Sequence, residues 1–164
     1  MLIIVFGLPG SGKTYFASAL AEALKCDHIN TDVIRKNHAN NPDYSVEGRN
    51  KIYDLMLEQC GEKLKNNQNL IVDGTFLKEN LRRLFTEKAR GLGEKTYFIE
   101  ISADEEVIRK RVSRKRKYSD ADYSVYEKLK SEFEPLKEDH LIIYSDTMEK
   151  EEMVLEARKF LNIS

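Results

Sequence analysis

Residues 7–14 read GLPGSGKT and match the pattern GxxxxGK[ST] at every fixed position. The run LIIVF at residues 2–6 precedes them and is apolar throughout, which is typical of a strand buried on both faces of a parallel sheet. After the motif, apolar residues recur at helical spacing from Phe16 to Leu24. The motif therefore joins a buried strand to an amphipathic helix, which favours an α/β fold over an incidental glycine-rich turn.

This context predicts a phosphate-binding loop. Glycines allow backbone N–H groups to surround phosphate oxygens, and the start of the following helix adds partial positive charge. We expect Lys13 to reach the β- and γ-phosphates of ATP, and the Thr14 hydroxyl to bind Mg²⁺ that bridges them. GTP switches and mechanical ATPases share such loops, so other residues must identify the reaction. The expected nucleotide-binding residues are Gly7, Leu8, Pro9, Gly10, Ser11, Gly12, Lys13 and Thr14.

Strand and helix patterns alternate along the rest of the chain. The alternation predicts a parallel sheet covered by helices on both sides. With 164 residues, no internal repeat and no linker, residues 1–164 are expected to form one domain. Further strands are expected at 28–30, 70–72, 96–101 and 141–144, and helices at 33–37, 45–65, 78–92, after the capping-box pair Ser102 and Glu105, at 122–134 and at 150–161.

Composition and charge exclude some classes of protein. The net charge is −1 and 41% of residues are hydrophobic, so any site for a polyanion must be a local patch. Cys26 and Cys60 have no metal-ligand spacing and are expected as buried apolar residues on helical faces, in a reducing intracellular setting. We assign no chemistry to His28, His38 and His140. No apolar run approaches the ~20 residues of a membrane span, so a cytoplasmic chain without a membrane partner is expected.

Three polar residues follow predicted strands. Asp32 and Arg35 come after the second strand, and Asp73 ends the third. The carboxyl ends of parallel strands line one crevice, so these side chains are expected near the nucleotide. Asp32 is then a candidate base for the attacking hydroxyl, Arg35 a ligand for an anionic acceptor, and Asp73 a residue that holds Mg²⁺ through water or orients the acceptor. The alternatives are a helix cap at Asp32 with a solvated Arg35, and an ordinary turn pair at Asp73 and Gly74.

A basic segment completes the candidate site. Seven of the nine residues from 109 to 117 are Lys or Arg. Arg111 and Arg114 share a helical face, and we expect them to fold over the triphosphate and stabilise charge on the transferred group, as part of a helical lid at about 109–122. The alternative for each single side chain is a solvated helix end that suits the helix dipole.

With these motifs in view, the sequence resembles the zeta-toxin-like P-loop kinases, particularly the kinase domain of 5′-hydroxyl polynucleotide kinases. The resemblance spans nearly the whole chain and rests on GLPGSGKT, TDVIRK, LIVDGTFLKENLRR, EEVIRKRVSRKRK and SDADYSVYEKLKSEFEPL. It implies a three-layer α/β/α fold with five parallel strands in the order 2-3-1-4-5. It also implies ATP and Mg²⁺ bound by Lys13 and Thr14, Asp32 as the general base, and Arg35 as a ligand of the acceptor phosphate.

The lid departs from the pattern of that family. Its polynucleotide kinases carry two lid arginines four residues apart, whereas the residue four beyond Arg111 is Lys115. Arg114 or Arg116 is then expected to substitute for the second arginine.

These features support several functions. The first hypothesis is transfer of the γ-phosphate of ATP to the 5′-hydroxyl end of a polynucleotide, since Arg35 and residues 109–117 could meet a polyanion. The alternative is a small-molecule kinase of gluconate, nucleoside or nucleotide type. Two functions are less favoured: a toxin-like kinase of a sugar nucleotide and a nucleotide-dependent switch. For the switch, the nearest match to the NKxD motif of GTP switches, residues 50–53, has Tyr53 in place of the aspartate.

Overall fold

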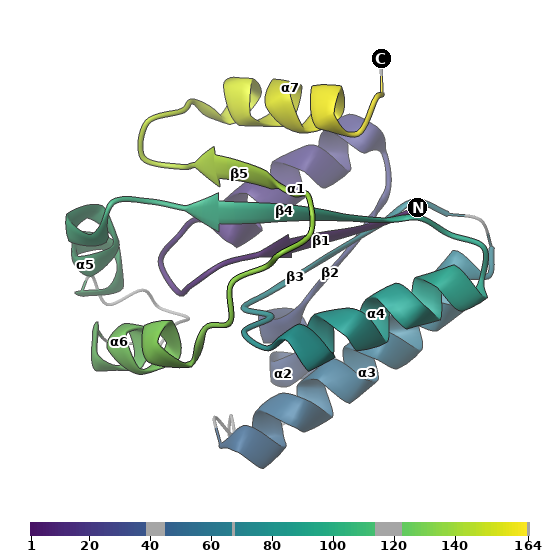
Figure 1. Ribbon diagram of the computed structural model, residues 1–164, viewed down its shortest axis with the longest axis horizontal. Coiled ribbons are helices and arrows are strands. Elements are labelled where there is room, and N and C mark those ends of the chain that lie inside the picture. The colour runs from purple at the N-terminus through teal and green to yellow at the C-terminus, as the bar shows by residue number, and fades with distance from the viewer. Residues whose placement is uncertain (39–44, 67, 114–122, 164) are drawn as a thin grey trace.

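The computed structural model describes residues 1–38, 45–66, 68–113 and 123–163. Five parallel strands form a sheet in the order β2-β3-β1-β4-β5 (Figure 1). The strands are β1 Leu2–Phe6, β2 Asp27–Asn30, β3 Leu70–Gly74, β4 Thr96–Ser102 and β5 Leu141–Tyr144. The described helices are α1 Lys13–Leu24, α2 Thr31–His38, α3 Val46–Leu64, α4 Glu79–Gly91, α5 Glu105–Ser113, α6 Tyr123–Glu132 and α7 Lys150–Phe160.

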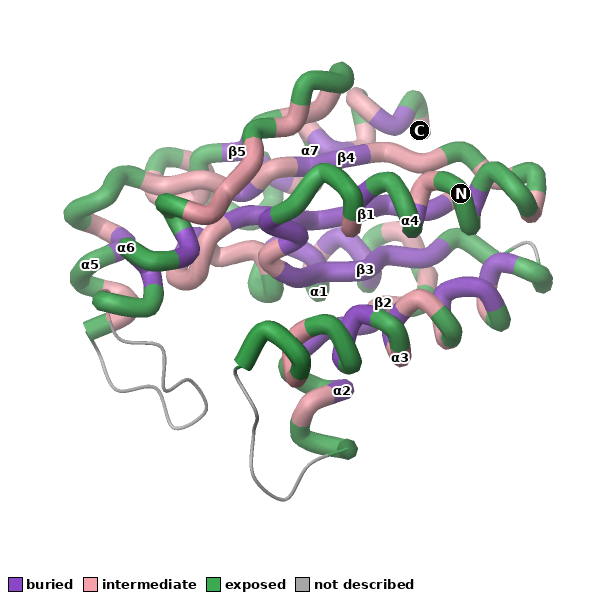
Figure 2. The backbone as a smooth tube through the Cα atoms, turned by 60° about the horizontal axis from the view of Figure 1, so that its bottom comes forward, coloured by how far each residue is buried: buried purple, intermediate pink, exposed green. Residues whose placement is uncertain are grey.

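Helices cover both faces of the sheet. α1 and α7 pack on one face and α3 and α4 on the other, while α5 and α6 lie beyond the carboxyl end of β4 (Figure 1). The expected three-layer fold and strand order are therefore confirmed. β1 and β3 are buried along their whole length (Figure 2), which explains why their sequences lack the alternation of a half-exposed strand. The core on the first face includes Ile3, Val5, Phe16, Leu20 and Met153, and the core on the second includes Leu2, Ile4, Phe6, Met56 and Phe85.

The register of the strands places their polar ends together. Asp73 of β3 pairs with Val5 of β1 on one side and with Asn30 of β2 on the other. The loop after β1 and the helix after β2 therefore begin at the same edge of the sheet. β3 also continues through Gly74, so Asp73 and Gly74 belong to a strand and the turn-pair alternative is wrong.

The expected capping box at the start of α5 is wrong as well. β4 runs to Ser102, whose carbonyl accepts a hydrogen bond from the Ser145 amide at 2.9 Å. Asp104 caps the helix instead, since its Oδ1 accepts the Glu106 amide at 2.8 Å. Strand pairing thus overrides a local pattern that fits a helix start.

The two cysteines differ in their surroundings. Cys60 is buried on α3 as expected, and this burial raises the pKa of its thiol to about 12. Cys26 is only partly buried and does not lie on a helix, because α1 ends at Leu24 and Lys25 turns the chain with a φ of 50°. In the part of the chain that the structure describes, no helix is long and apolar enough to cross a bilayer.

Candidate active site

The loop between β1 and α1 has the shape that its glycines permit. Gly10 and Gly12 have φ values of 80° and 96°, in the left-handed region that disfavours residues with a Cβ. A Cβ on Gly10 would lie 2.8 Å from Val112 Cγ1 of α5, so the loop passes directly beneath that helix. α1 begins at Lys13, so the N-terminus of this helix lies at the end of the loop.

Lys13 is held at the base of the loop. Its Nζ donates a hydrogen bond to the Leu8 carbonyl at 3.2 Å. Part of the side chain stays accessible, but burial of the ammonium group lowers the pKa of Lys13. The nearby carboxylates of Asp73 and Asp32 oppose this shift. A bound polyphosphate would place further negative charge beside the ammonium group and so favour its charged form.

Asp73 forms the centre of a polar network at the end of β3. Its side chain is 1% exposed, and its Oδ2 accepts the Thr14 hydroxyl at 2.7 Å. Asn30 Nδ2 lies 2.8 and 3.0 Å from the two carboxylate oxygens, and His28 Nε2 lies 2.5 Å from Oδ1. Three residues from α1 and β2 therefore fix the orientation of one buried carboxylate.

Asp32 and Arg35 lie together on α2. Arg35 Nη1 donates to Asp32 Oδ1 at 2.6 Å, and the two residues stand one helical turn apart. Asp32 has 61% of its side chain exposed, whereas Arg35 has 13%. The Asp32 carboxylate is thus accessible to a ligand, whereas most of the Arg35 side chain is buried against the protein.

One cavity of about 470 Å³ connects these groups. Lys13, Thr14 and Asp73 line this cavity, and Asp32 and Arg35 line it as well. The structure thereby brings together most of the residues that the sequence singled out. The other lining residues are Pro9, Gly10, Gly12, Tyr15, Asn30, Thr31, Arg49, Tyr53, Thr75, Arg111, Val125, Leu129 and Ser145.

Arg111 is tied to the phosphate-binding loop. Its Nη1 donates to the carbonyls of Gly10 and Ser11 at 3.2 and 3.4 Å, and it also contacts the Ser145 hydroxyl at 2.8 Å. Ser145 Oγ in turn donates to the Ser11 carbonyl at 2.5 Å. Arg111 is therefore anchored at the rim of the cavity and is not a solvated helix end.

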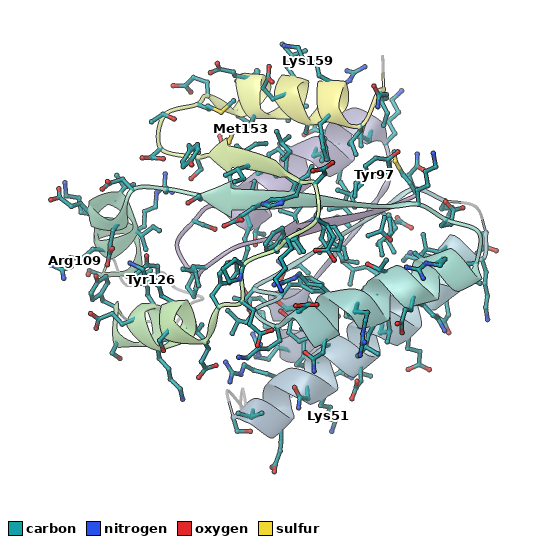
Figure 3. All side chains as sticks on the ribbon, viewed as in Figure 1. Lys51, Tyr97, Arg109, Tyr126, Met153 and Lys159 are labelled. Carbon is teal, nitrogen blue, oxygen red and sulfur yellow. The ribbon has the colours of Figure 1, made fainter. Side chains whose placement is uncertain are left out.

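Arg109 of the basic segment differs from Arg111. Arg109 lies on the outer side of α5 (Figure 3), where its guanidinium group stacks over the Tyr123 ring at 4.4 Å from the centroid. It does not line the cavity. Arg114, Lys115 and Arg116 lie outside the described residues, as does the expected lid beyond residue 113.

The family follows from a comparison with known proteins. A family model described as an AAA domain, AAA_33, matches residues 2–136. This stretch includes the phosphate-binding loop, the Asp73 network and every cavity residue except Ser145. The chain belongs to the AAA_33 family. The P-loop kinase-like domain that the sequence predicts is thus confirmed, whereas the comparisons give no support to the zeta-toxin-like or polynucleotide kinase assignment.

Individual relatives of this AAA_33 chain are kinases. It is 27% identical to an adenylate kinase from Phytoplasma australiense over 71% of this chain and 59% of that protein, so it spans less than two thirds of this curated relative. It resembles the solved gluconokinase from Sinorhizobium meliloti 1021, with a TM-score of 0.74, 21% identity and coverage of 98% and 90% of the two chains. It also resembles an APS kinase from Mycobacterium tuberculosis in complex with AMPPNP and APS, with a TM-score of 0.76, 15% identity and coverage of 98% and 96%.

The oxygen donors of this AAA_33 site suit a magnesium ion. Among the described residues there is no group of three or more His, Cys, Asp or Glu side chains that could hold a metal. Mg²⁺ in nucleotide sites needs no such cage, because it keeps several waters and binds one or two protein oxygens together with the phosphates. Thr14 Oγ1, open to the cavity, and Asp73 Oδ2 behind it are hard oxygen donors of the kind it prefers.

Several residues in or beside the site escaped the sequence analysis, among them His28, Asn30, Arg49 and Ser145. His28 was assigned no chemistry, yet it contacts Asp73, and Asn30 stands beside it at the end of β2. The position of Asn30 at a strand end is a signal that could have found it. Arg49 on α3 and Ser145 after β5 carry no local signal, because only the tertiary fold brings them to the cavity.

Proposed function

We propose that this chain is an ATP-dependent phosphotransferase that transfers the γ-phosphoryl group to a hydroxyl of a small anionic acceptor. The observation that carries this proposal is one cavity of about 470 Å³ that is lined by Lys13 and Thr14 together with Asp32, Arg35 and Arg49. A phosphate-binding loop supplies the donor end, and a carboxylate with two guanidinium groups supplies the acceptor end. Cavities of ~300–1,000 Å³ are typical of small-molecule sites.

At the donor end, the backbone amides of residues 10–14 and Lys13 bind the triphosphate. Thr14 would hold Mg²⁺ through its hydroxyl, and Asp73 would support it through water or by orienting that hydroxyl. When bound, the metal offsets charge on the phosphates. Arg111 at the rim of the cavity supports the loop through the Gly10 and Ser11 carbonyls.

At the acceptor end, Asp32 is the base. The acceptor oxygen attacks the γ-phosphorus, its proton passes to an Asp32 oxygen, and ADP leaves as the bond to the β-phosphate oxygen breaks. Arg35 now pairs with Asp32 at 2.6 Å, so an anionic group that binds Arg35 would release this carboxylate for proton transfer. Arg49, which pairs with Glu132 at 3.5 Å, offers a second guanidinium group to the same acceptor.

The small-molecule acceptor is better supported than a polynucleotide. The relatives are named as kinases of adenylate, gluconate and APS. The basic groups of the site, Lys13, Arg35, Arg49 and Arg111, line one cavity, whereas Arg109 of the basic segment lies away from it. A polynucleotide would instead require a charged track for several phosphates.

The test is phosphoryl transfer from γ-labelled ATP with Mg²⁺ to a panel of sugar acids, nucleosides, nucleoside monophosphates and 5′-hydroxyl oligonucleotides. We expect label on a hydroxyl of an anionic small molecule, little on the neutral nucleosides, and ~10²-fold or more slower labelling with Asp32→Asn. Label on the oligonucleotides, with an acceptor affinity that falls steeply with salt, would instead favour the polynucleotide hypothesis. Release of inorganic phosphate without any labelled acceptor would favour a nucleotide-dependent switch.

A further inference from the structure

Asn30, the last residue of β2, contacts both ends of the cavity with one side chain. It is 6% exposed. Its Nδ2 lies 3.1 Å from Thr14 Oγ1 and 2.8 Å from Asp73 Oδ1, while its Oδ1 accepts the backbone amides of Asp32 at 2.7 Å and Val33 at 3.1 Å. The amide nitrogen thus faces the donor end, and the amide oxygen faces the helix that carries Asp32.

The hydrogens of this network can be assigned one by one. An amide nitrogen has two hydrogens, and a hydroxyl has one hydrogen and two lone pairs. One Asn30 hydrogen is directed at the Asp73 carboxylate and the other at Thr14 Oγ1. Thr14 donates its hydrogen to Asp73 Oδ2 at 2.7 Å and accepts one from Asn30, so one lone pair of its hydroxyl stays available to a cation.

The oxygen of Asn30 fixes the start of α2. The amides of Asp32 and Val33 donate to Asn30 Oδ1, which is the hydrogen-bond pattern of an N-cap. Asparagine is among the residues preferred at this position. α2 spans only Thr31–His38, so its first turn makes up much of the helix. The position of Asp32 relative to Thr14 therefore depends on one shared amide.

We propose that Asn30 is a positioning residue that couples the Mg²⁺ ligand Thr14 to the helix that carries the base. The inference rests on the proposed function, because it takes the two ends of the cavity as donor and acceptor sites. Asn30 touches neither reacting group directly. Its nitrogen orients the hydroxyl and carboxylate at one end, and its oxygen sets the first turn of α2 at the other.

Two substitutions separate the halves of this role. Serine is also a good N-cap, so Asn30→Ser keeps an acceptor for the α2 amides but is too short to reach Thr14 and Asp73. Asn30→Ala removes both contacts. The matched control is Asn37→Ser, which makes the same change at an exposed position of α2 outside the cavity.

The first measurement needs no acceptor and no transfer. The affinity for AMPPNP is compared in Mg²⁺ and in EDTA. In both Asn30 variants we expect the ratio of the AMPPNP affinity in Mg²⁺ to that in EDTA to fall about tenfold, with the affinity in EDTA unchanged. A change of this size is what the loss of one hydrogen bond to a metal ligand implies. A purely structural residue would lower the melting temperature and leave this ratio unchanged. The wild-type ratio in both variants would overturn the proposal.

The second measurement concerns the start of α2. Hydrogen exchange at the Asp32 and Val33 amides should stay slow in Asn30→Ser and become fast in Asn30→Ala. With an acceptor in hand, its KM should rise in Asn30→Ala more than in Asn30→Ser. Slow exchange in both variants would overturn the coupling to the base. Because AMPPNP binding and hydrogen exchange are read without catalysis, their outcome is separate from that of the transfer assay.

Discussion

The two ends of the cavity hold their side chains in different ways. At the donor end, the carboxylate of Asp73 is buried and accepts hydrogen bonds from Thr14, Asn30 and His28. At the acceptor end, Asp32 has 61% of its side chain exposed and pairs with Arg35 of the same helix. The donor end is thus fixed by several elements before a ligand binds, whereas the acceptor end is held by contacts that a ligand can replace.

This difference fits the two ligands that we propose. Every turnover presents the same triphosphate, so a rigid set of dipoles and charges lowers the barrier without reorganisation. The acceptor must enter, displace the partners of the arginines and leave as a charged product. Substitutions at the two ends should therefore have different signatures. At the donor end we expect loss of nucleotide binding, with loss of stability where the Asp73 network is broken. At the acceptor end we expect loss of turnover or acceptor affinity with an unchanged fold.

The largest effect is expected for Lys13→Met at the donor end. We expect kcat to fall by ~10³-fold or more with every acceptor, because the ammonium group stabilises charge on the transferred phosphoryl group. Persistent transfer would contradict the mechanism. Lys51→Met, at an exposed position of α3 (Figure 3), is the matched control and should keep full activity.

The same variant should not lose stability without ligand. Burial lowers the pKa of Lys13, so the charged form costs folding free energy at neutral pH. The unfolded chain keeps this proton up to the ordinary value of 10.5, and the folded chain releases it at lower pH, so wild-type stability gains from Lys13 as pH rises through this window. Denaturant unfolding should show Lys13→Met at least as stable as wild type near pH 7, with an advantage that shrinks toward pH 10.5.

The next effect is that of Asp32→Asn at the acceptor end. We expect kcat to fall by ~10²-fold or more, because the amide cannot accept the hydroxyl proton. Since Asp32 is exposed, AMPPNP affinity and the melting temperature should stay at their wild-type values. Unchanged turnover would remove Asp32 from the role of base, and a large loss of stability would place it with the fixed donor end.

Asp73→Asn should show the opposite signature. The new amide group would face donors from Thr14, Asn30 and His28 and leave at least one of them without an acceptor, at a cost of about 2 kcal/mol in unfolding free energy. The Mg²⁺-dependent part of AMPPNP binding should weaken as well. Chemical unfolding and nucleotide titration measure the two effects, and a variant as stable as wild type would show that the network does not fix this end.

The sequence predicts the donor end more fully than the acceptor end. The motif GLPGSGKT with its flanking strand and helix indicates the loop, and the rule that parallel strands share a carboxyl edge brings Asp32 and Asp73 to it. The strand order followed from a family resemblance, because periodicity within a strand says nothing about its neighbours. The layered α/β fold is therefore readable from local patterns and one long-range rule, whereas the strand order is not.

The missed residues depend on tertiary structure. Asn30 and Asp73 are in register across two strands that lie 43 residues apart in the chain, and no local pattern encodes that pairing. A basic helix likewise has the same sequence whether its arginines are solvated or bound. The sequence analysis expected Arg111 either over the triphosphate or in solvent, so it did not predict the Arg111 contacts with the Gly10 carbonyl and the Ser145 hydroxyl.

Arg35→Gln tests the grip on the acceptor. We expect the acceptor KM to rise by about tenfold and the ATP KM to change less, because the lost group is a charged hydrogen-bond donor for an anionic ligand. Arg83→Gln is the matched control, since Arg83 is 68% exposed on α4 and pairs only loosely with Glu87 at 3.8 Å. A larger change in the ATP KM would reassign Arg35 to the donor end.

The smallest effect is expected for Arg49→Gln, which asks how far the acceptor site extends. The ion pair of Arg49 with Glu132 is long, at 3.5 Å, and both side chains are partly exposed, so its loss should change unfolding free energy by less than ~1 kcal/mol. If the acceptor anion also reaches α3, its KM should rise by a few fold and rise further in the double variant with Arg35→Gln. If one anionic group binds both arginines, the rise in the double variant should differ from the product of the single effects. Steady-state kinetics of the four proteins measure this coupling. Independent effects would mean that the two guanidinium groups bind different parts of the acceptor, and no effect of Arg49→Gln would limit the acceptor site to α2.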